Sequence, residues 1–253
     1  MAEPIIKIRD MDYSIEGKNI LHGINLDIYP CEIFMIIGLS GSGKSTLLRL
    51  LSGLIYPTSG TIEILGIKLS ADMPQKEYTQ LLSEVGFVFQ FGALFDSLTV
   101  KENVGFRLYE HSKMKNDDIE EKIADTLSLV GMTTTEDMFP SELSGGMQKR
   151  IGIARSLAQD PKVLLYDEPN SGLDPIISAT IDELIVDLKN KKNVTAVVVT
   201  HDIKSVMNVS SRVAFLYDGS MSFIGNINDI KSSNNDALQQ FLTGNTEGPI
   251  KVI

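Results

Sequence analysis

The sequence predicts an α/β protein with a mostly parallel sheet, and three observations support this fold class. Two short runs, Ile33–Ile37 and Val163–Asp167, are almost wholly apolar, which suits central parallel strands covered on both faces. Apolar residues between and after these runs follow helical spacing. The first run also leads directly into a glycine-rich loop and a helix. No internal repeat or linker interrupts the 253 residues, so we expect a single domain over 1–253.

Short strands separated by turns are expected in the first sixty or so residues. A turn is placed at Gly17-Lys18, and the strands around it are expected over residues 5–13, 24–29 and 33–37. The leucines after the glycine loop follow helical spacing, and this helix is expected to end at Gly53.

Helical periodicity replaces the strand pattern in the middle of the chain. Asn116 and Asp117 offer N-caps for one helix that ends before Gly131, and a second helix is expected to begin near Ser144. We therefore expect three parts: a nucleotide-binding core at 1–90 and 161–225, a helical insert at 91–160, and a C-terminal extension at 226–253.

Strands and capped helices return after the insert. Asp174 is suited to cap a helix that starts at Pro175, and the apolar stripe of this helix is Ile177, Ile181, Leu184 and Leu188. Two more strands are expected over 194–200 and 213–217. A last apolar stripe precedes Gly244 and consists of Ala237, Leu238, Phe241 and Leu242. This stripe is expected to be buried against another surface, together with the apolar residues Pro249, Ile250, Val252 and Ile253.

Acidic residues are in excess. Lys and Arg total 23 against 33 Asp and Glu, giving a net charge of −10, which disfavours nucleic acid as a partner. The single cysteine, Cys31, cannot form an internal disulfide, and with only three histidines no Cys/His zinc cluster can be assembled. No signal peptide and no apolar run of ~18 residues is found. We expect a cytosolic protein, or one attached to a membrane through a partner.

Residues 38–45 match the phosphate-binding pattern G-x-x-x-x-G-K-[ST]. In such a loop, glycines let backbone N–H groups face phosphates, and a lysine neutralises phosphate oxygens. A plain glycine turn is the alternative, which the flanking strand and helix disfavour. The candidate nucleotide-binding residues are Gly38, Ser40, Gly41, Ser42, Gly43, Lys44, Ser45 and Thr46.

Asp167 and Glu168 end the second apolar run. At a strand end beside a phosphate loop, Asp167 can hold Mg²⁺ and Glu168 can polarise a water for attack on a γ-phosphate. Alone, the pair could equally be two solvated acids.

The segment Leu143-Ser144-Gly145-Gly146-Met147 precedes a helix, where it forms either an anion site or an ordinary cap. The order of motifs is more informative. The phosphate loop is followed by Gln90, the Ser-Gly-Gly turn, Asp167-Glu168, residues 171–174 (Ser-Gly-Leu-Asp) and His201. Over nearly its whole length, the chain thereby resembles the ATP-binding cassette (ABC) ATPases.

This resemblance implies a P-loop NTPase core of the RecA-like type with a mostly parallel sheet, an antiparallel β subdomain and a helical subdomain specific to the family. It also implies hydrolysis of ATP with Mg²⁺. Glu168, His201 and Gln90 would be catalytic, and Ser45, Gln90 and Asp167 would hold the metal. Tyr13 would stack on adenine, unless it is simply a half-buried strand tyrosine.

In this family, two chains share each ATP site. Ser144, Gly145 and Gly146 would reach the γ-phosphate held by a second copy of the chain, and Asp174 would line the interface. ATP would join the copies and hydrolysis would release them, which is the two-state cycle that an integral membrane permease needs.

A narrower resemblance involves Met147, where many members have a glutamine whose nucleotide contact is lost here. Segments 90–95, 172–176 and 240–250 are likewise similar to the MCE-associated, Mla-type phospholipid transporters. This implies a permease with an MCE-type lipid-binding subunit and a STAS-type accessory protein, at the cytoplasmic side of the inner membrane. The tail would then be covered by the partner ATPase subunit, or else be frayed. Phe91, Leu94 and Phe95 are either core or a docking site for a permease helix.

Three other functions remain open from the sequence. An importer of polar solutes such as amino acids shares the Pro140-x-x-Leu143-Ser-Gly-Gly arrangement, although methionine-type importers usually append a regulatory domain. A soluble ABC protein of translation or DNA repair would carry two cassettes or a long coiled coil. A P-loop kinase would leave Ser144 and His201 unexplained.

Overall fold

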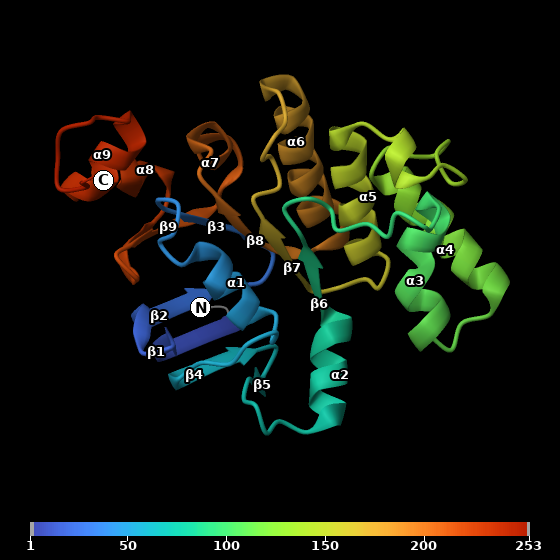
Figure 1. The fold of residues 1–253 in the computed structure, drawn as a ribbon, viewed down its shortest axis with the longest axis horizontal. Helices are drawn as coiled ribbons and strands as arrows, with labels where there is room; N and C mark the ends of the chain where they lie inside the picture. The colour runs from blue at the N-terminus through green and yellow to red at the C-terminus, as the bar shows by residue number, and fades with distance from the viewer. Residues whose placement is uncertain (1–2, 252–253) are drawn as a thin grey trace.

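The computed structural model describes residues 3–251 and contains a six-stranded, mostly parallel sheet (Figure 1). Five of its strands run parallel to their neighbours, and β10 (Ser220–Gly225) is an antiparallel edge strand. In spatial order after β10, the strands are β9 (Arg212–Tyr217), β3 (Ile33–Ile37), β8 (Thr195–Thr200), β7 (Val163–Asp167) and β6 (Val85–Val88). The predicted α/β class with a mostly parallel sheet is confirmed.

A second sheet is antiparallel and four-stranded. Its spatial order is β2 (Lys18–Ile28), β1 (Ile6–Ile15), β4 (Ser59–Ile64) and β5 (Ile67–Lys68). The strand expected over 24–29 is shorter than the observed strand β2, which already begins at Lys18, directly after the turn at Gly17. Its first half is mostly exposed, so it lacks the apolar alternation that identifies a half-buried strand.

Alternate residues of the parallel strands enter two separate cores. Phe34 and Ile36 of β3 pack with the antiparallel sheet and with α1 (Lys44–Leu51). Met35 and Ile37 belong to the other core, which is built with four helices on the opposite face of the sheet: α3 (Val100–His111), α4 (Asn116–Leu129), α5 (Gly145–Leu157) and α6 (Pro175–Lys192). Figure 1 shows α3, α4 and α5 grouped beyond the β6 edge of the sheet. Both faces of the sheet are therefore covered.

The helix starts test the capping predictions. Asp174 caps α6 by accepting hydrogen bonds from two backbone N–H groups, and Pro175 is the first helical residue, as predicted. The helix start predicted near Ser144 is confirmed, and Ser144 caps α5. The prediction for α4 was wrong: its N-cap is Lys115, which makes no side-chain cap bond, and Asn116 is already helical. Two aspartates in the first turn of α4 instead favour the positive end of the helix dipole.

Four further helices complete the described chain. They are α2 (Gln75–Glu84), α7 (Ile203–Val209), α8 (Ile227–Lys231) and α9 (Asp236–Thr243), and a 3₁₀ turn covers Pro140–Glu142. Among residues 3–251, no helix combines the length and the hydropathy that crossing a bilayer requires.

The C-terminal tail is attached to its own chain at a few buried positions. α9 ends at Gly244 as predicted, and its buried residues belong to the same core as β9, where the ring of Phe241 lies 5.3 Å from that of Phe215. Ile250 is buried in this core. The side-chain amide of Gln240, also buried, donates to the backbone carbonyl oxygen of Ile250 and accepts a hydrogen bond from the Ile250 N–H. For Ala237, Leu238 and Ile250 the cover comes from the same chain, and the expectation that the partner subunit supplies it was wrong at these positions, whereas Pro249 is exposed. Val252 and Ile253 lie outside them.

Replacing Ile250 is expected to destabilise the protein. Ile250→Ala should lower the free energy of unfolding by about 2 kcal/mol, because it removes buried apolar surface from a packed site. Chemical denaturation measures this change. Lys251→Ala, at the exposed neighbouring position, is the matched control and should change stability by less than about 0.5 kcal/mol. Equal midpoints for Ile250→Ala and the wild type would show that the tail is not part of the cooperative core.

Candidate functional site

The glycine loop joins β3 to α1 in a backbone conformation that its sequence requires. A Cβ atom on Gly38 would lie 2.2 Å from the carbonyl oxygen of Leu216. Gly43 has φ 103° as the N-cap of α1, and a Cβ there would lie 2.7 Å from Cδ2 of Leu21. Side chains are thus excluded at both ends of the turn, where the backbone must pack closely.

Lys44 is a buried cation within this loop. Its Nζ donates to the carbonyl oxygens of Gly38 and Leu39, both at 2.8 Å. Burial lowers the pKa of Lys44, while the nearby charges of Glu168 and Asp167 oppose that shift. Among the described residues, the buried hydroxyl of Ser42 has no hydrogen-bond partner. A buried ammonium and a free hydroxyl beside a helix N-terminus suit an anionic group such as a phosphate.

Ser45 and Asp167 meet at the same place. The Ser45 hydroxyl donates to Oδ1 of Asp167 at 2.9 Å, although 122 positions separate them in the sequence. Burial raises the pKa of Asp167, and the Ser45 bond partly offsets this. Within residues 3–251, no cluster of three His, Cys, Asp or Glu side chains could hold a metal alone. Two such oxygens fit Mg²⁺, which is bound through one or two protein ligands together with phosphate and water oxygens.

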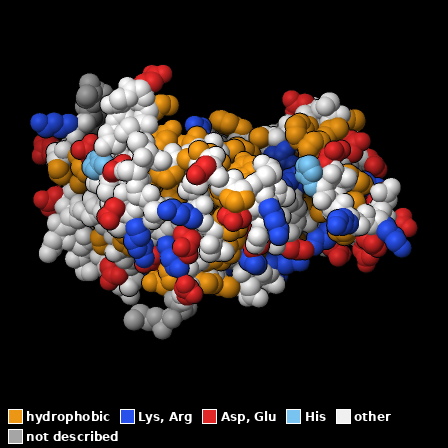
Figure 2. All heavy atoms as spheres, turned by 90° about the horizontal axis from the view of Figure 1, so that it is seen from below, with side chains coloured by type: hydrophobic (Ala, Val, Ile, Leu, Met, Phe, Trp, Pro, Cys, Tyr) orange, Lys and Arg blue, Asp and Glu red, His pale blue; other side chains and the backbone are white. Residues whose placement is uncertain are grey.

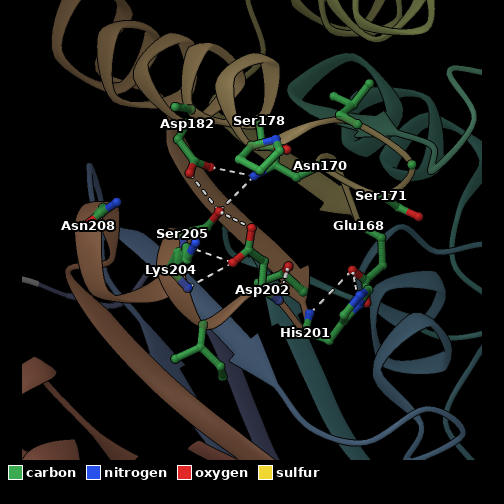
Figure 3. A pocket seen from close by; sticks show the side chains of 16 residues that line it. Glu168, Asn170, Ser171, Ser178, Asp182, His201, Asp202, Lys204, Ser205 and Asn208 are labelled. Atoms are coloured by element: carbon green, nitrogen blue, oxygen red, sulfur yellow. Dashed lines mark hydrogen bonds and ion pairs between the residues drawn. The ribbon is translucent and has the colours of Figure 1, made fainter.

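Glu168 and His201 form the second pair of the site (Figure 3). Nδ1 of His201 lies 2.8 Å from Oε2 of Glu168, and the histidine side chain is 64% exposed against 13% for the glutamate. Glu168 has φ 48°, an uncommon left-handed conformation for a side-chain-bearing residue. Its N–H donates to Val199 of β8 at 2.9 Å, and Nζ of Lys149 on α5 donates to its carbonyl oxygen at 3.3 Å. The backbone is therefore held from both sides.

Gln90 and the residues 171–174 are also brought together. The side-chain amide of Gln90 donates to the Ser171 hydroxyl at 3.0 Å. Gly146 lies where α5 meets α6, since a Cβ there would come within 2.6 Å of Ile177. Ser144 and Asp174, the caps of these two helices, are exposed and lie at neighbouring helix starts.

The remaining predicted residues lie around the loop. Ser40 and Gly41 are exposed at its tip, Thr46 is half-buried in the first turn of α1, and Gly145 is exposed at the start of α5. Tyr13 is half-buried on β1, and its strand partner Leu21 is the residue that contacts Gly43. The strand that carries Tyr13 therefore runs beside the loop.

Sequence reasoning missed two features of this region. Lys149 is buried next to Glu168, and a lysine on the inward face of an apolar helix was an available signal. Asn170, Asp182 and Ser205 form a buried hydrogen-bonded cluster beside an open pocket of about 550 Å³ lined in part by Glu168 and His201. These residues come from three separate segments, so no local pattern announces them.

A parallel sheet with a glycine loop, a buried lysine and two carboxylates at the strand ends defines a P-loop nucleotide hydrolase. Residues 21–171 match the family model described as ABC transporter. The chain belongs to this family and is an ATP-binding subunit that hydrolyses ATP.

Two relatives and one solved structure are similar over most of their length. Protein TRIGALACTOSYLDIACYLGLYCEROL 3, chloroplastic, of Arabidopsis thaliana is 41% identical over 99% of this chain and 76% of its own. The probable ribonucleotide transport ATP-binding protein mkl of Mycobacterium leprae is 36% identical, over 97% of this chain and 70% of its own. The dimeric post-hydrolysis structure of the ATP-binding cassette MJ0796, bound to ADP and Pi, has a TM-score of 0.78 at 32% identity, covering 88% of this chain and 98% of its own.

Proposed function

We propose that this chain powers a lipid-transporting membrane permease of the Mla type by binding and hydrolysing ATP as a homodimer. ATP hydrolysis is supported by one observation: the structure brings together Lys44, the Ser45–Asp167 pair and the Glu168–His201 pair. The lipid assignment is supported by the plant relative, whose name is that of a galactolipid and which matches 99% of the chain. Met147 and the segments that resemble the Mla type point the same way.

The residues around the loop have distinct roles in this proposal. Lys44 binds the β- and γ-phosphates with the N–H groups of the loop, and Tyr13 stacks on adenine. Ser45, Asp167 and Gln90 hold Mg²⁺, which supplies charge neutralisation to the phosphates. Glu168 accepts a proton from the attacking water, and His201 contacts the γ-phosphate while its bond to Glu168 orients the carboxylate.

The dimer completes each site in this proposal. Ser144, Gly145 and Gly146 offer the N-terminus of α5 to nucleotide held by a second copy, and Asp174 lies beside them. Ile176, which is 77% exposed and lies two residues after Asp174, would lie at this interface. The dimeric structure of the MJ0796 cassette, bound to ADP and Pi, is consistent with this arrangement.

An apolar groove is the candidate docking surface for the permease. The groove encloses about 370 Å³ between β6 and α3, and exposed aromatic rings line it, namely those of Phe89, Phe95 and Phe106. Phe91, in the loop beside it, is 80% exposed, so it is not core, whereas Leu94 packs on the interior. An amphipathic helix of the permease fits such a groove.

The remaining partners follow from the same resemblance. An MCE-type lipid-binding subunit and a STAS-type accessory protein would assemble with the permease at the cytoplasmic side of the inner membrane. Nucleic acid is not a partner in this proposal, in keeping with the net charge of −10. On the face in Figure 2, acidic side chains are interspersed among the basic ones.

Substitutions in the apolar groove and in the loop beside it are expected to impair assembly with the permease without changing ATP hydrolysis. The double change Phe91→Ser with Phe106→Ser should reduce copurification with a polytopic membrane protein at least about tenfold, because it removes apolar contact area. The basal ATPase rate should remain at the wild-type value. Affinity purification from detergent-solubilised membranes, with mass spectrometry of proteins and lipids, measures both quantities.

Phe139→Ser is the control, since Phe139 is exposed to about the same degree as Phe106 (42% against 39%) but neither lines the groove nor lies in the loop beside it. It should leave assembly unchanged. Wild-type yields from the double variant would refute the docking surface. Lipid in the wild-type complex supports the proposal, whereas a copurified solute-binding protein would favour a polar-solute importer, a possibility raised by the ribonucleotide-transport name of the Mycobacterium leprae relative. Ribosomes without a permease would favour a soluble ABC protein.

A further inference from the structure

A buried polar network joins three segments behind the candidate site (Figure 3). It consists of Asn170, Asp182 and Ser205, each more than nine-tenths buried. The side-chain amide of Asn170 donates to Oδ1 of Asp182 and to Oγ of Ser205, both at 2.8 Å. The Ser205 hydroxyl donates to Oδ2 of Asp182 at 2.7 Å. The three side chains thus form a closed ring of hydrogen bonds.

The network is anchored next to both members of the Glu168–His201 pair. Asn170 follows Glu168 by two residues, in the turn that leaves β7. Ser205 lies in the first turn of α7, which begins two residues after His201. Asp202, between them, caps α7 by accepting from the N–H of Lys204 at 2.9 Å and also approaches the Ser205 hydroxyl at 3.2 Å. Asp182 supplies a fixed point on the long helix α6.

His201 is held from the side of the sheet, because it directly follows β8, whose Thr200 pairs with Ile37 of β3, and its backbone N–H lies 3.4 Å from Oε2 of Glu168. Its side chain is mostly exposed, so packing contributes little, and its ring meets Glu168 through one 2.8 Å bond. The residue lies in the short link between β8 and α7. The start of α7 therefore constrains the link on its far side, and the network fixes that start relative to the end of β7.

Filling the protein interior at this place does not require a polar network. A buried carboxylate carries a desolvation penalty, which here raises the pKa of Asp182, and well-packed apolar residues would fill the same space without it. What the polar groups provide is directional contact between specific segments.

We propose, on the basis of the roles proposed above for Glu168 and His201, that Asn170, Asp182 and Ser205 are positioning residues for ATP hydrolysis. They hold the start of α7 against the turn after β7, and so keep His201 in contact with the Glu168 carboxylate. Because each side chain is more than nine-tenths buried, the proposal gives none of the three a direct contact with the nucleotide. Their effect reaches the reaction through the His201–Glu168 bond.

Ser205→Ala tests this role with the loss of one oxygen atom. It leaves one Asn170 hydrogen without an acceptor and Oδ2 of Asp182 without a donor. We expect kcat for ATP hydrolysis to fall about tenfold, with KM for ATP changed less than roughly twofold. Ser210→Ala is the matched control: it removes a serine hydroxyl from the other end of α7, where it bonds only to Val206 among the described residues, and should leave both constants unchanged.

A cycle with His201→Ala distinguishes positioning from general damage. If the network acts through His201, Ser205→Ala should cause no further loss of kcat in the His201→Ala background. Ser205→Thr keeps the hydroxyl and should restore most of the rate. Asn170→Ala removes another member of the ring and should reproduce the loss, which keeps the test available should Ser205→Ala fold poorly.

The outcomes separate this proposal from the one on which it rests. Wild-type kcat in folded Ser205→Ala and Asn170→Ala, or losses that multiply with that of His201→Ala, would overturn the network proposal alone. Wild-type hydrolysis by His201→Ala or Glu168→Gln would instead overturn the roles proposed for the site itself.

Discussion

Glu168→Gln is expected to slow ATP hydrolysis by about 10²-fold or more while leaving the affinity for ATP unchanged. Glutamine has the shape of glutamate and can occupy the same left-handed backbone position, but it cannot accept a proton from water. Its side-chain oxygen can still accept the bond from His201, so the local geometry should persist. Phosphate release at saturating ATP measures the rate, and titration with a fluorescent ATP analogue measures the affinity.

Glu183→Gln is the control for the loss of one negative charge, because Glu183 is exposed on α6 away from the loop. It should hydrolyse ATP normally. If Glu168→Gln retains the wild-type rate, Glu168 is not the base.

Lys44→Ala is expected to abolish measurable ATP binding. The lysine is the buried cation of the loop, and charge-assisted bonds to phosphate in a partly desolvated site are among the strong ones. The loss should reach about 10²-fold in affinity or more, since two phosphates lose their side-chain partner. Calorimetric titration with ATP measures it.

Lys191→Ala provides the matched control at an exposed lysine that pairs only with Asp187 among the described residues. Unchanged affinity in folded Lys44→Ala would reject the phosphate-loop assignment. Thermal unfolding of each variant verifies folding before the comparison is made.

The parts of the fold that could be predicted are those whose signals are local. The signals for the apolar strand β3, for the almost wholly apolar β7, for the cap at Asp174 and for the glycine end of α9 each depend on a few adjacent residues. In contrast, α2 was not predicted, although Tyr78, Leu81 and Leu82 follow helical spacing; this short signal was overlooked. For α3, the capping box of Thr99 and Glu102 was a usable signal that was overlooked.

The candidate site divides in the same way. The loop at 38–45 and the pair at 167–168 are contiguous in sequence, so their chemistry could be inferred directly. Contacts between distant residues could not, such as that of Gln90 with Ser171 or the ring around Asp182. The cover of Ile250 was misassigned for this reason, because an apolar residue near the end of a chain gives no indication of which surface buries it.

The central claim is that each chain holds half of two ATP sites, and sedimentation of Glu168→Gln tests it most directly. With saturating ATP and Mg²⁺, the variant is predicted to sediment as a dimer, and with ADP as a monomer, because in the proposed dimer the γ-phosphate would bridge the loop of one copy and the Ser144 turn of the other. Adding Ser144→Arg should return the ATP-bound protein to a monomer. A chain that stays monomeric with ATP bound, or that dimerises equally with Ser144→Arg, would contradict the account.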